Sequence, residues 1–416
     1  MAKAMGWGPA GRTLLHRWSF RDGALPAGVS FARAATSYVV DRNGRWASIG
    51  SGAAPFSYSH NGSRYRGYVP FSERTNLLAA DTHNDFSSAS WTKTGFNVTS
   101  AQRAGPFGTT TMWEIEDTSS GADWMYQAVS ISADTKIRVF SCHVAAGTAS
   151  QVRMWVNQFG GSGSQGLANF NLSTGAITTT LGSSDLMNID AMGNGVYRIS
   201  VGVVNANDTT AAVALQAGPG DSATGTFFAE WAQYEESPQS AGAAYPSPPL
   251  AGGATRPSDN ATATLAVTLP ATFLVYADCN HIPGGLSYAY SLTDGTLNFN
   301  LVNIQSLDRP TNNSVGYHVM AGGANQGGEN TAGLMSGAFP RVAWGVRCGT
   351  NDFSCDGKGV AGTTDNSGTL PTGLDEHAFG FLDILDNGWF EQGLLSVDVY
   401  SGLVSRAEVQ RLIYIG

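Results

Sequence analysis

Charged residues and long apolar runs are both scarce in this chain of 416 residues. Only 13% of the residues are charged, a balance that disfavours exposed helical surfaces. No apolar run approaches the roughly 18 residues that a membrane helix requires. The first residues also lack the continuous apolar stretch of a secretory signal. We therefore expect a soluble protein that folds in a cytoplasm and has no membrane partner.

Cysteine pairs with metal-binding spacing are also missing. The four cysteines show no C-x-x-C motif, so a reduced and partly buried role is favoured for Cys142, Cys279, Cys348 and Cys355. The last two flank a turn at Asn351-Asp352 and are placed to face each other across a hairpin. Their redox state therefore stays open.

Catalytic motifs are equally absent. The seven histidines are scattered, and there is no H-E-x-x-H, no G-x-S-x-G and no Gly-rich phosphate loop. The carboxylates Glu114, Glu116 and Asp117, or Glu235 with Glu236, are candidates for a glycosidase pair, but true pairs usually come from separate strands. Solvated charges at strand edges are the favoured interpretation. We predict no catalytic residue and no enzyme.

Glycine and regular turn signals are abundant, and they indicate the fold class. The chain holds 52 glycines, and short apolar-polar alternations are cut roughly every eight to twelve residues by Gly, Asn, Asp and Ser. The length suits two cores. We predict an all-β protein with two jelly-roll-type β-sandwiches in tandem, an extended N-terminal segment and one short C-terminal helix. The helix is predicted from a capping box at 405–408 and the apolar stripe Val409, Leu412 and Ile413.

Four segments follow from this pattern: an N-terminal segment 1–75, a sandwich 76–246, a proline-rich linker 247–259 and a second sandwich 260–416. The N-terminal segment cannot build a core of its own, and its large apolar side chains are unfavourable in water. We therefore expect it to be laid onto another subunit as an anchor. The predicted anchor residues are Trp7, Leu14, Leu15, Arg17, Trp18 and Phe20.

The N-terminal segment is basic, whereas the rest of the chain is acidic. Residues 1–75 carry ten Lys or Arg against three Asp or Glu, and because the whole chain has a net charge of −9, the remainder carries −16. The Arg residues are dispersed among Gly, Trp and Tyr without a recognition helix. Docking on an acidic protein is favoured over nucleic acid, which we do not expect as a partner.

An ordered series of short motifs carries a family resemblance. Residues 25–41 and Glu73-Arg74-Thr75-Asn76-Leu77-Leu78 open the series, and it continues through 89–93, 106–110, 145–150, 168–175 and 193–201. Residues 20–256 thereby resemble a family of tailed-bacteriophage structural proteins that contain a jelly-roll module similar to carbohydrate-binding modules. Residues 260–415, with Arg341-Val342-Ala343-Trp344-Gly345-Val346 and 388–400, resemble a concanavalin-type, laminin-G-like sandwich.

The resemblance implies a noncatalytic bacteriophage virion structural protein, namely a tail fibre, spike or head decoration. Such a protein is docked on the particle by its N-terminal segment and projects its sandwiches for host-surface attachment. Its partners are other phage virion proteins and copies of itself, most simply in a homotrimer, and its location is the virion, after synthesis in the host cytoplasm. The alternatives are a glycan-binding adhesin that recognises host surface glycans and a polysaccharide depolymerase. Head or tail location, symmetry and ligand stay open.

Two Trp-containing alternations are candidate sugar sites, because sugars bind to aromatic side chains that lie beside planar polar groups. Arg153, Trp155 and Asn157 share one face of a predicted strand, and Trp231 and Gln233 share one face of another. The alternative, which weighs more, is that both Trp side chains belong to a core or a subunit interface.

No cofactor and no metal ligand is predicted. Both domain types carry structural calcium in some related proteins, so the resemblance keeps that ion open. Asp294-Gly295 and Asp383-Ile384-Leu385-Asp386-Asn387 offer oxygen ligands. Turn-forming Asp and Asn explain these loops equally well.

Overall fold

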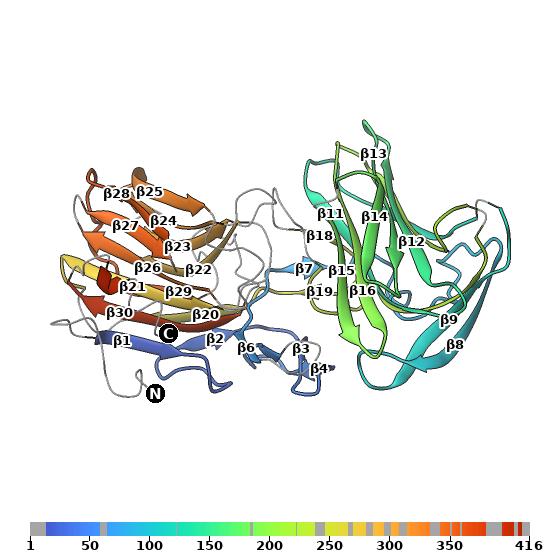
Figure 1. The fold of residues 1–416 in the computed structure, drawn as a ribbon, viewed down its shortest axis with the longest axis horizontal. Helices are drawn as coiled ribbons and strands as arrows, with labels where there is room; N and C mark the ends of the chain where they lie inside the picture. Colours follow the sequence, from blue (N-terminus) through green and yellow to red (C-terminus); the bar gives the residue numbers. More distant parts are fainter. Residues whose placement is uncertain are drawn as a thin grey trace.

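Two β-rich bodies lie side by side in the computed structural model (Figure 1). The structure describes residues 14–58, 65–121, 123–183, 186–221, 223–237, 246–264, 269–279, 286–294, 301–307, 314–332, 342–349, 352–357, 360–379, 393–402 and 407–409. Antiparallel pairing builds both bodies, so the chain is all-β, as predicted.

The first body, here called the inserted sandwich, has a sheet of five strands packed on a sheet of six. The five-stranded sheet has the order β10 (Met125–Ser130), β17 (Thr210–Ala217), β12 (Gln151–Phe159), β13 (Ser164–Asn171) and β14 (Ala176–Leu181). The six-stranded sheet has the order β15 (Met187–Gly193), β16 (Val196–Val204), β11 (Ile137–Ala146), β18 (Gly225–Glu236), β9 (Thr110–Asp117) and β8 (Phe96–Ala104).

Strict alternation along the strands places the core of the inserted sandwich. In β12, Val152, Met154 and Val156 are fully buried and pack with side chains such as Phe140 and Phe170, while the residues between them are half-buried. Because successive side chains of a strand point to opposite faces, one face of each sheet builds this core. The other face is left for contacts outside it.

The second body, here called the split sandwich, draws strands from both ends of the chain. One sheet has β28 (Val360–Asp365), β27 (Phe353–Gly357), β26 (Val342–Gly349), β21 (Thr272–Cys279), β30 (Leu394–Ser401), β6 (Tyr65–Tyr68) and β5 (Phe56–Tyr58), with β1 (Leu14–Ser19) also on β30. The other has β2 (Ser30–Ala32), β20 (Asn260–Thr264), β29 (Glu376–Phe379), β22 (Leu286–Thr293), β23 (Leu301–Leu307), β24 (Ser314–Ala321) and β25 (Ala324–Ala332).

The short helix near the C-terminus is present at residues 407–409. Its Val409 is buried against Leu274, Tyr276 and Tyr400, so it packs on the split sandwich as expected. Leu412 and Ile413 of the predicted apolar stripe lie outside the described residues.

The N-terminal segment differs from the prediction, because it completes a core within its own chain. β1 pairs along β30, and Trp18 and Phe20 are buried in the core of the split sandwich. Arg17 forms an ion pair with Asp398, about 380 residues away in sequence. The interpretation of an anchor laid onto another subunit is therefore wrong for these side chains, since local patterns do not reveal so distant a partner. The predicted anchor residue Trp7 lies outside the described residues.

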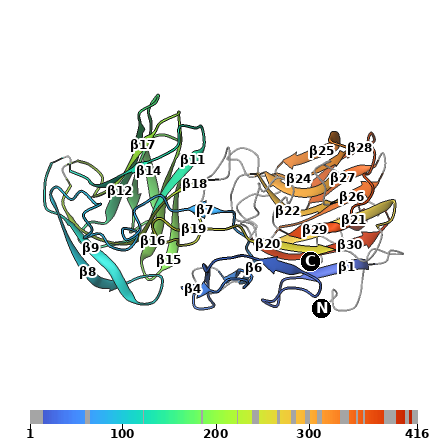
Figure 2. The same cartoon turned by 180° about the vertical axis from the view of Figure 1, so that it is seen from behind.

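The chain leaves the split sandwich through β7 (Arg74–Thr75), forms the inserted sandwich and returns through β19 (Thr255–Arg256). These two short strands pair with each other in antiparallel orientation. Figure 2 shows them crossing between the two bodies. Next to them, the buried Asn76 donates from Nδ2 to the carbonyls of Ala232 and Leu250, and its Oδ1 accepts from the amides of Leu78 and Tyr234. One amide side chain thus ties together the start and the end of the insertion.

The predicted linker 247–259 is packed in place for most of its length, because its polar groups have partners in the sandwiches. Ser247 donates from Oγ to Glu235 at 2.7 Å, and Asp259 forms a buried ion pair with Arg33 at 2.8 Å. A third small element, the hairpin of β3 (Ser37–Val40) and β4 (Trp46–Ile49), reaches the inserted sandwich through Trp46.

The four cysteines are buried, and none of them forms a disulfide. Val346 of β26 pairs with Cys355 of β27, so Cys348 is offset from Cys355 by two residues along the hairpin. The sequence suggested that these two thiols face each other, and the observed register does not place them directly opposite. Burial raises the pKa of the Cys348 thiol well above its usual range, which disfavours the reactive thiolate.

Candidate functional site

An apolar row crosses the outer face of the five-stranded sheet in the inserted sandwich. Strand register places one residue from each strand side by side, and this outer row consists of Tyr126, Ala214, Trp155, Leu167 and Leu181. Its ends are exposed, with Tyr126 at 38% and Leu181 at 45%, and Trp155 is half-buried at its centre. With strands about 4.8 Å apart, the row is roughly 19 Å long, a length that suits an extended chain of sugar rings.

Planar polar side chains flank the outer row on both sides. One neighbouring line contains Gln216, Arg153 and Asn169, and the other contains Asn157 and Gln165. The predicted trio Arg153, Trp155 and Asn157 therefore does share the outward face of β12, and the structure brings further amides to it from β13 and β17.

Trp155 is held at its position by a second indole. The rings of Trp124 and Trp155 have centroids 5.4 Å apart and are tilted by 46°, and the Arg153 guanidinium lies 5.2 Å from the Trp124 ring centroid. Arg153 also forms an ion pair with Asp221 and contacts Gln216 Oε1 at 3.5 Å. These contacts fix the guanidinium and both rings as one unit.

Polar atoms without a hydrogen-bond partner cluster beneath this surface. Within the described part of the chain, no partner is present for Trp155 Nε1, Gln216 Nε2, Asn169 Oδ1 or Arg153 Nε, although all four atoms are shielded from solvent. Folded proteins rarely leave such atoms unpaired, and each unpaired group is unfavourable by about 1–3 kcal/mol.

The second predicted alternation lies on the other sheet, where Gln233 is buried and Trp231 is half-buried. Gln233 is buried, donates to Glu235 and to Ser247 Oγ at 3.0 Å, and accepts from the amide of Leu250. Trp231 stacks on Phe107, with ring centroids 4.9 Å apart. The structure therefore gives Gln233 a packing role, so the hypothesis of a sugar site at Gln233 is wrong. Trp231 is half-buried among neighbouring rings, and its role in sugar binding stays a prediction.

Trp231 sits at a bulge that turns its side chain away from the sheet. The register of β18 against β11 shifts between the partners of Ser141 and His143, and Trp231 has a φ of 50°. This left-handed conformation is rare and strained for an aromatic residue. The bulge aims the indole at Phe107, His83 and Tyr38, whose packing compensates for the strain.

A buried carboxyl lies next to this bulge. Glu230 accepts a hydrogen bond from Thr111 Oγ1 at 2.6 Å, and His143 Nδ1 lies 3.9 Å from Glu230 Oε1. Burial raises the pKa of Glu230 to about 7, although the bond from Thr111 opposes the shift. A carboxyl and an imidazole this close are capable of acid–base chemistry, but both are buried, so they are inaccessible to a polymeric substrate.

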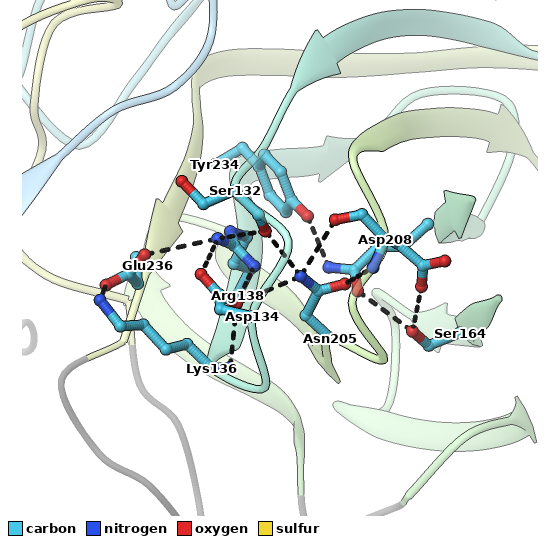
Figure 3. Close-up of polar contacts among 10 residues, drawn as sticks. Ser132, Asp134, Lys136, Arg138, Ser164, Asn205, Asp208, Tyr234 and Glu236 are labelled. Atoms are coloured by element: carbon cyan, nitrogen blue, oxygen red, sulfur yellow. Dashed lines mark hydrogen bonds and ion pairs between the residues drawn. The ribbon is translucent and has the colours of Figure 1, made fainter. Parts of the chain in front are cut away.

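Figure 3 shows a polar network at one end of the inserted sandwich. Arg138 donates to Asp134 at 2.7 and 2.9 Å, and Asn205 Nδ2 donates to the carbonyl of Ser132 and to Asp134. Burial raises the pKa of Asp134, but the bonds from Arg138 and Asn205 outweigh it and lower the pKa to about 2. Side chains of the protein itself thus supply the cation and the donors at this end of the sandwich.

Metal ligands do not gather among the residues that the structure describes. No group of three or more His, Cys, Asp or Glu side chains there is arranged to hold a metal ion. Residues 383–387 and Gly295, which the sequence offered as oxygen ligands, lie outside the described ranges, so structural calcium there stays an expectation. No helix in those ranges is long and apolar enough to span a membrane.

Sequence reasoning missed most of the site apart from the β12 trio. Trp124, Tyr126, Leu167, Asn169 and Gln216 reach the outer row from segments whose pairing is set by long-range register. The alternation Gln165, Leu167, Asn169 against the buried Ala168 and Phe170 was a usable local signal for one of these strands. Nothing local indicates which strands lie beside β12.

Comparisons with known proteins found solved structures that are similar to this chain at low sequence identity. No protein-family model matches the chain, and no curated protein matches its sequence. The CBM40 module of the Ruminococcus gnavus IT-sialidase, solved with α2,3-sialyllactose, is 12% identical with a TM-score of 0.29, over 34% of this chain and 80% of that one. The LG4-5 domains of the mouse laminin alpha1 chain are 9% identical with a TM-score of 0.25, over 78% and 90%. The CBM22 tandem of Xyn10C from Paenibacillus barcinonensis is 9% identical with a TM-score of 0.27, over 80% and 100%.

Proposed function

We propose that this chain is a noncatalytic glycan-binding protein that binds sugar on the outer row of the inserted sandwich. The observation that carries the proposal is the half-buried Trp155 at the centre of an apolar row flanked by amides, above four unpaired polar atoms. Sugar rings have an apolar face and an equatorial rim of hydroxyls. They match a surface that offers an indole for stacking and amides for hydrogen bonding.

One of the carboxylate pairs that the sequence offered for a glycosidase, Glu235 with Glu236, supports a noncatalytic role. Glu235 is buried and bonds to Gln233 and Ser247, and Glu236 pairs with Lys136 and Arg138. A glycosidase needs two carboxyl groups that flank a bound sugar. Both of these carboxylates are instead bonded to other side chains of the protein.

A glycan array with the wild-type protein and Asn169→Ala tests the proposal. We expect the wild type to bind one class of glycan, and we expect Asn169→Ala to bind it about five- to tenfold more weakly, since one acceptor next to Trp155 is lost. A reducing-end assay on the bound glycan is expected to show no release of new ends. An array without any bound glycan would contradict the proposal, and release of new ends would favour the depolymerase.

The wider setting that we propose is the tailed-phage virion, as a fibre, spike or decoration that attaches to host surface glycans. This part rests on the motif series in residues 20–256 and includes other virion proteins and a homotrimer as partners. The proposal does not include docking on the particle through Leu15, Trp18 and Phe20, because these side chains pack in or against the core of the split sandwich. Retention of the protein on purified particles and a trimer mass by light scattering are the expected results.

A further inference from the structure

The strands that carry the outer row contain a single positively charged side chain. Arg153 is the only charged residue in the five strands β10, β12, β13, β14 and β17, whose other polar residues are all uncharged amides and hydroxyls. The ionic character of this face therefore depends on what Arg153 contacts.

Arg153 is already neutralised by a carboxylate of the same chain. Asp221, in the loop after β17, forms an ion pair with Arg153 Nη1. The Asp221 side chain is 60% exposed while that of Arg153 is only 12% exposed, so the carboxylate covers the guanidinium from the solvent side. Trp124 and Gln216 hold the same guanidinium. Asp221 and Gln216 both bind Nη1, so a ligand carboxylate reaches this nitrogen of Arg153 only by displacing Asp221.

We propose that Asp221 is a specificity-determining residue that limits the outer row to uncharged glycans. This inference rests on the proposed glycan-binding function. A uronate carboxylate that approaches Arg153 has to displace Asp221 and is repelled by it, whereas a neutral sugar needs only the indole and the amides. Selectivity of this kind arises from a repulsive group that is set against the wrong ligand.

The test compares Asp221→Asn with Glu116→Gln on one array of neutral and uronate hexasaccharides. Both substitutions remove one negative charge, but Glu116 is exposed on β9 of the other sheet and bonds to Asn97. We expect Asp221→Asn to raise uronate binding at least tenfold, with a steep loss on added salt, and to change neutral-glycan binding less than threefold. Glu116→Gln is expected to change neither. Thermal melts of all three proteins confirm that the variants are folded.

Two results separate the inference from the function on which it rests. If the wild type binds neutral glycans and Asp221→Asn gains no uronate binding, the role of Asp221 is contradicted and the glycan-binding function stands. If the wild type binds no glycan and Asp221→Asn gains uronate binding, the role of Asp221 stands and the proposed function fails. Equal binding of uronates by Asp221→Asn and Glu116→Gln would overturn the inference in either case.

Discussion

The outer faces of the two sheets in the inserted sandwich differ in how far other segments cover them, although each contains a tryptophan in a similar alternation. On the five-stranded sheet, Trp155 is half-buried in a row whose ends are exposed. On the six-stranded sheet, Gln233 and Glu235 are covered by residues such as Ser247, and Trp231 is packed on Phe107. A Trp-x-polar alternation therefore shows which residues share a face, but not whether that face is open.

Part of the covering of the six-stranded sheet comes from segments outside the sandwich itself. The segment after β18 and the β3–β4 hairpin supply Ser247, Leu250 and Trp46, which bond to Glu235, Gln233 and His143 respectively. The insertion of one sandwich into the other thus covers part of one outer face and not the other. The proposed glycan site lies on the uncovered face.

The largest expected effect comes from the N-terminal strand, on which the insertion depends. Trp18→Ala removes an indole that contacts His377 and Phe379, with ring centroids 4.8 and 5.0 Å away. We expect the free energy of unfolding to fall by about 3–5 kcal/mol. Chemical denaturation is the measurement, with Leu14→Ala as the control, because Leu14 is exposed on the same strand. An unchanged unfolding midpoint for Trp18→Ala would show that β1 does not contribute to the stability of the split sandwich.

The covered face also predicts a pH dependence through Glu230. The raised folded-state pKa of about 7 means that the folded protein keeps a proton which the unfolded chain releases near its ordinary pKa of about 4.5. The contribution of the protonated carboxyl is therefore complete below pH 4.5 and is lost as the pH rises through 7. We expect a loss of roughly 3 kcal/mol over this window.

Denaturation curves at several pH values check this contribution. The comparison of wild type with Glu230→Gln isolates it, because the amide does not titrate and its curve is expected to lack this pH-dependent loss. Parallel curves for the two proteins from pH 4.5 to 7 would show that Glu230 is solvated.

A smaller effect is expected from Gln233, the polar partner of Trp231 in the original alternation. Gln233→Ala leaves the buried amide of Leu250 without its acceptor and removes one donor from Glu235 and one from Ser247 Oγ. We expect a loss of about 2–4 kcal/mol in the free energy of unfolding and unchanged glycan binding. A melt and an array on one preparation measure both quantities, and weaker binding without a loss of stability would restore Gln233 as a ligand residue.

The fold class and the side-chain directions within single strands could be predicted from the sequence. The pairing of strands that are distant in the sequence could not. The alternation in β12 correctly separated Arg153, Trp155 and Asn157 from the core, because side-chain direction has a period of two along a strand. The pairing of β1 with β30 joins residues about 380 positions apart, and no local pattern encodes it. The same limit hid the neighbours of Trp155 and the covering of Trp231.

The most direct test makes the same substitution on both faces and measures binding and stability together. The best glycan from the array is titrated calorimetrically into Trp155→Ala and Trp231→Ala, and both variants are melted. We expect Trp155→Ala to weaken binding at least tenfold and to lose less than about 1 kcal/mol of stability. We expect Trp231→Ala to bind as the wild type does and to lose about 2–3 kcal/mol. Full binding by Trp155→Ala, or a loss of binding in a stable Trp231→Ala, would contradict the assignment of the open and the covered face.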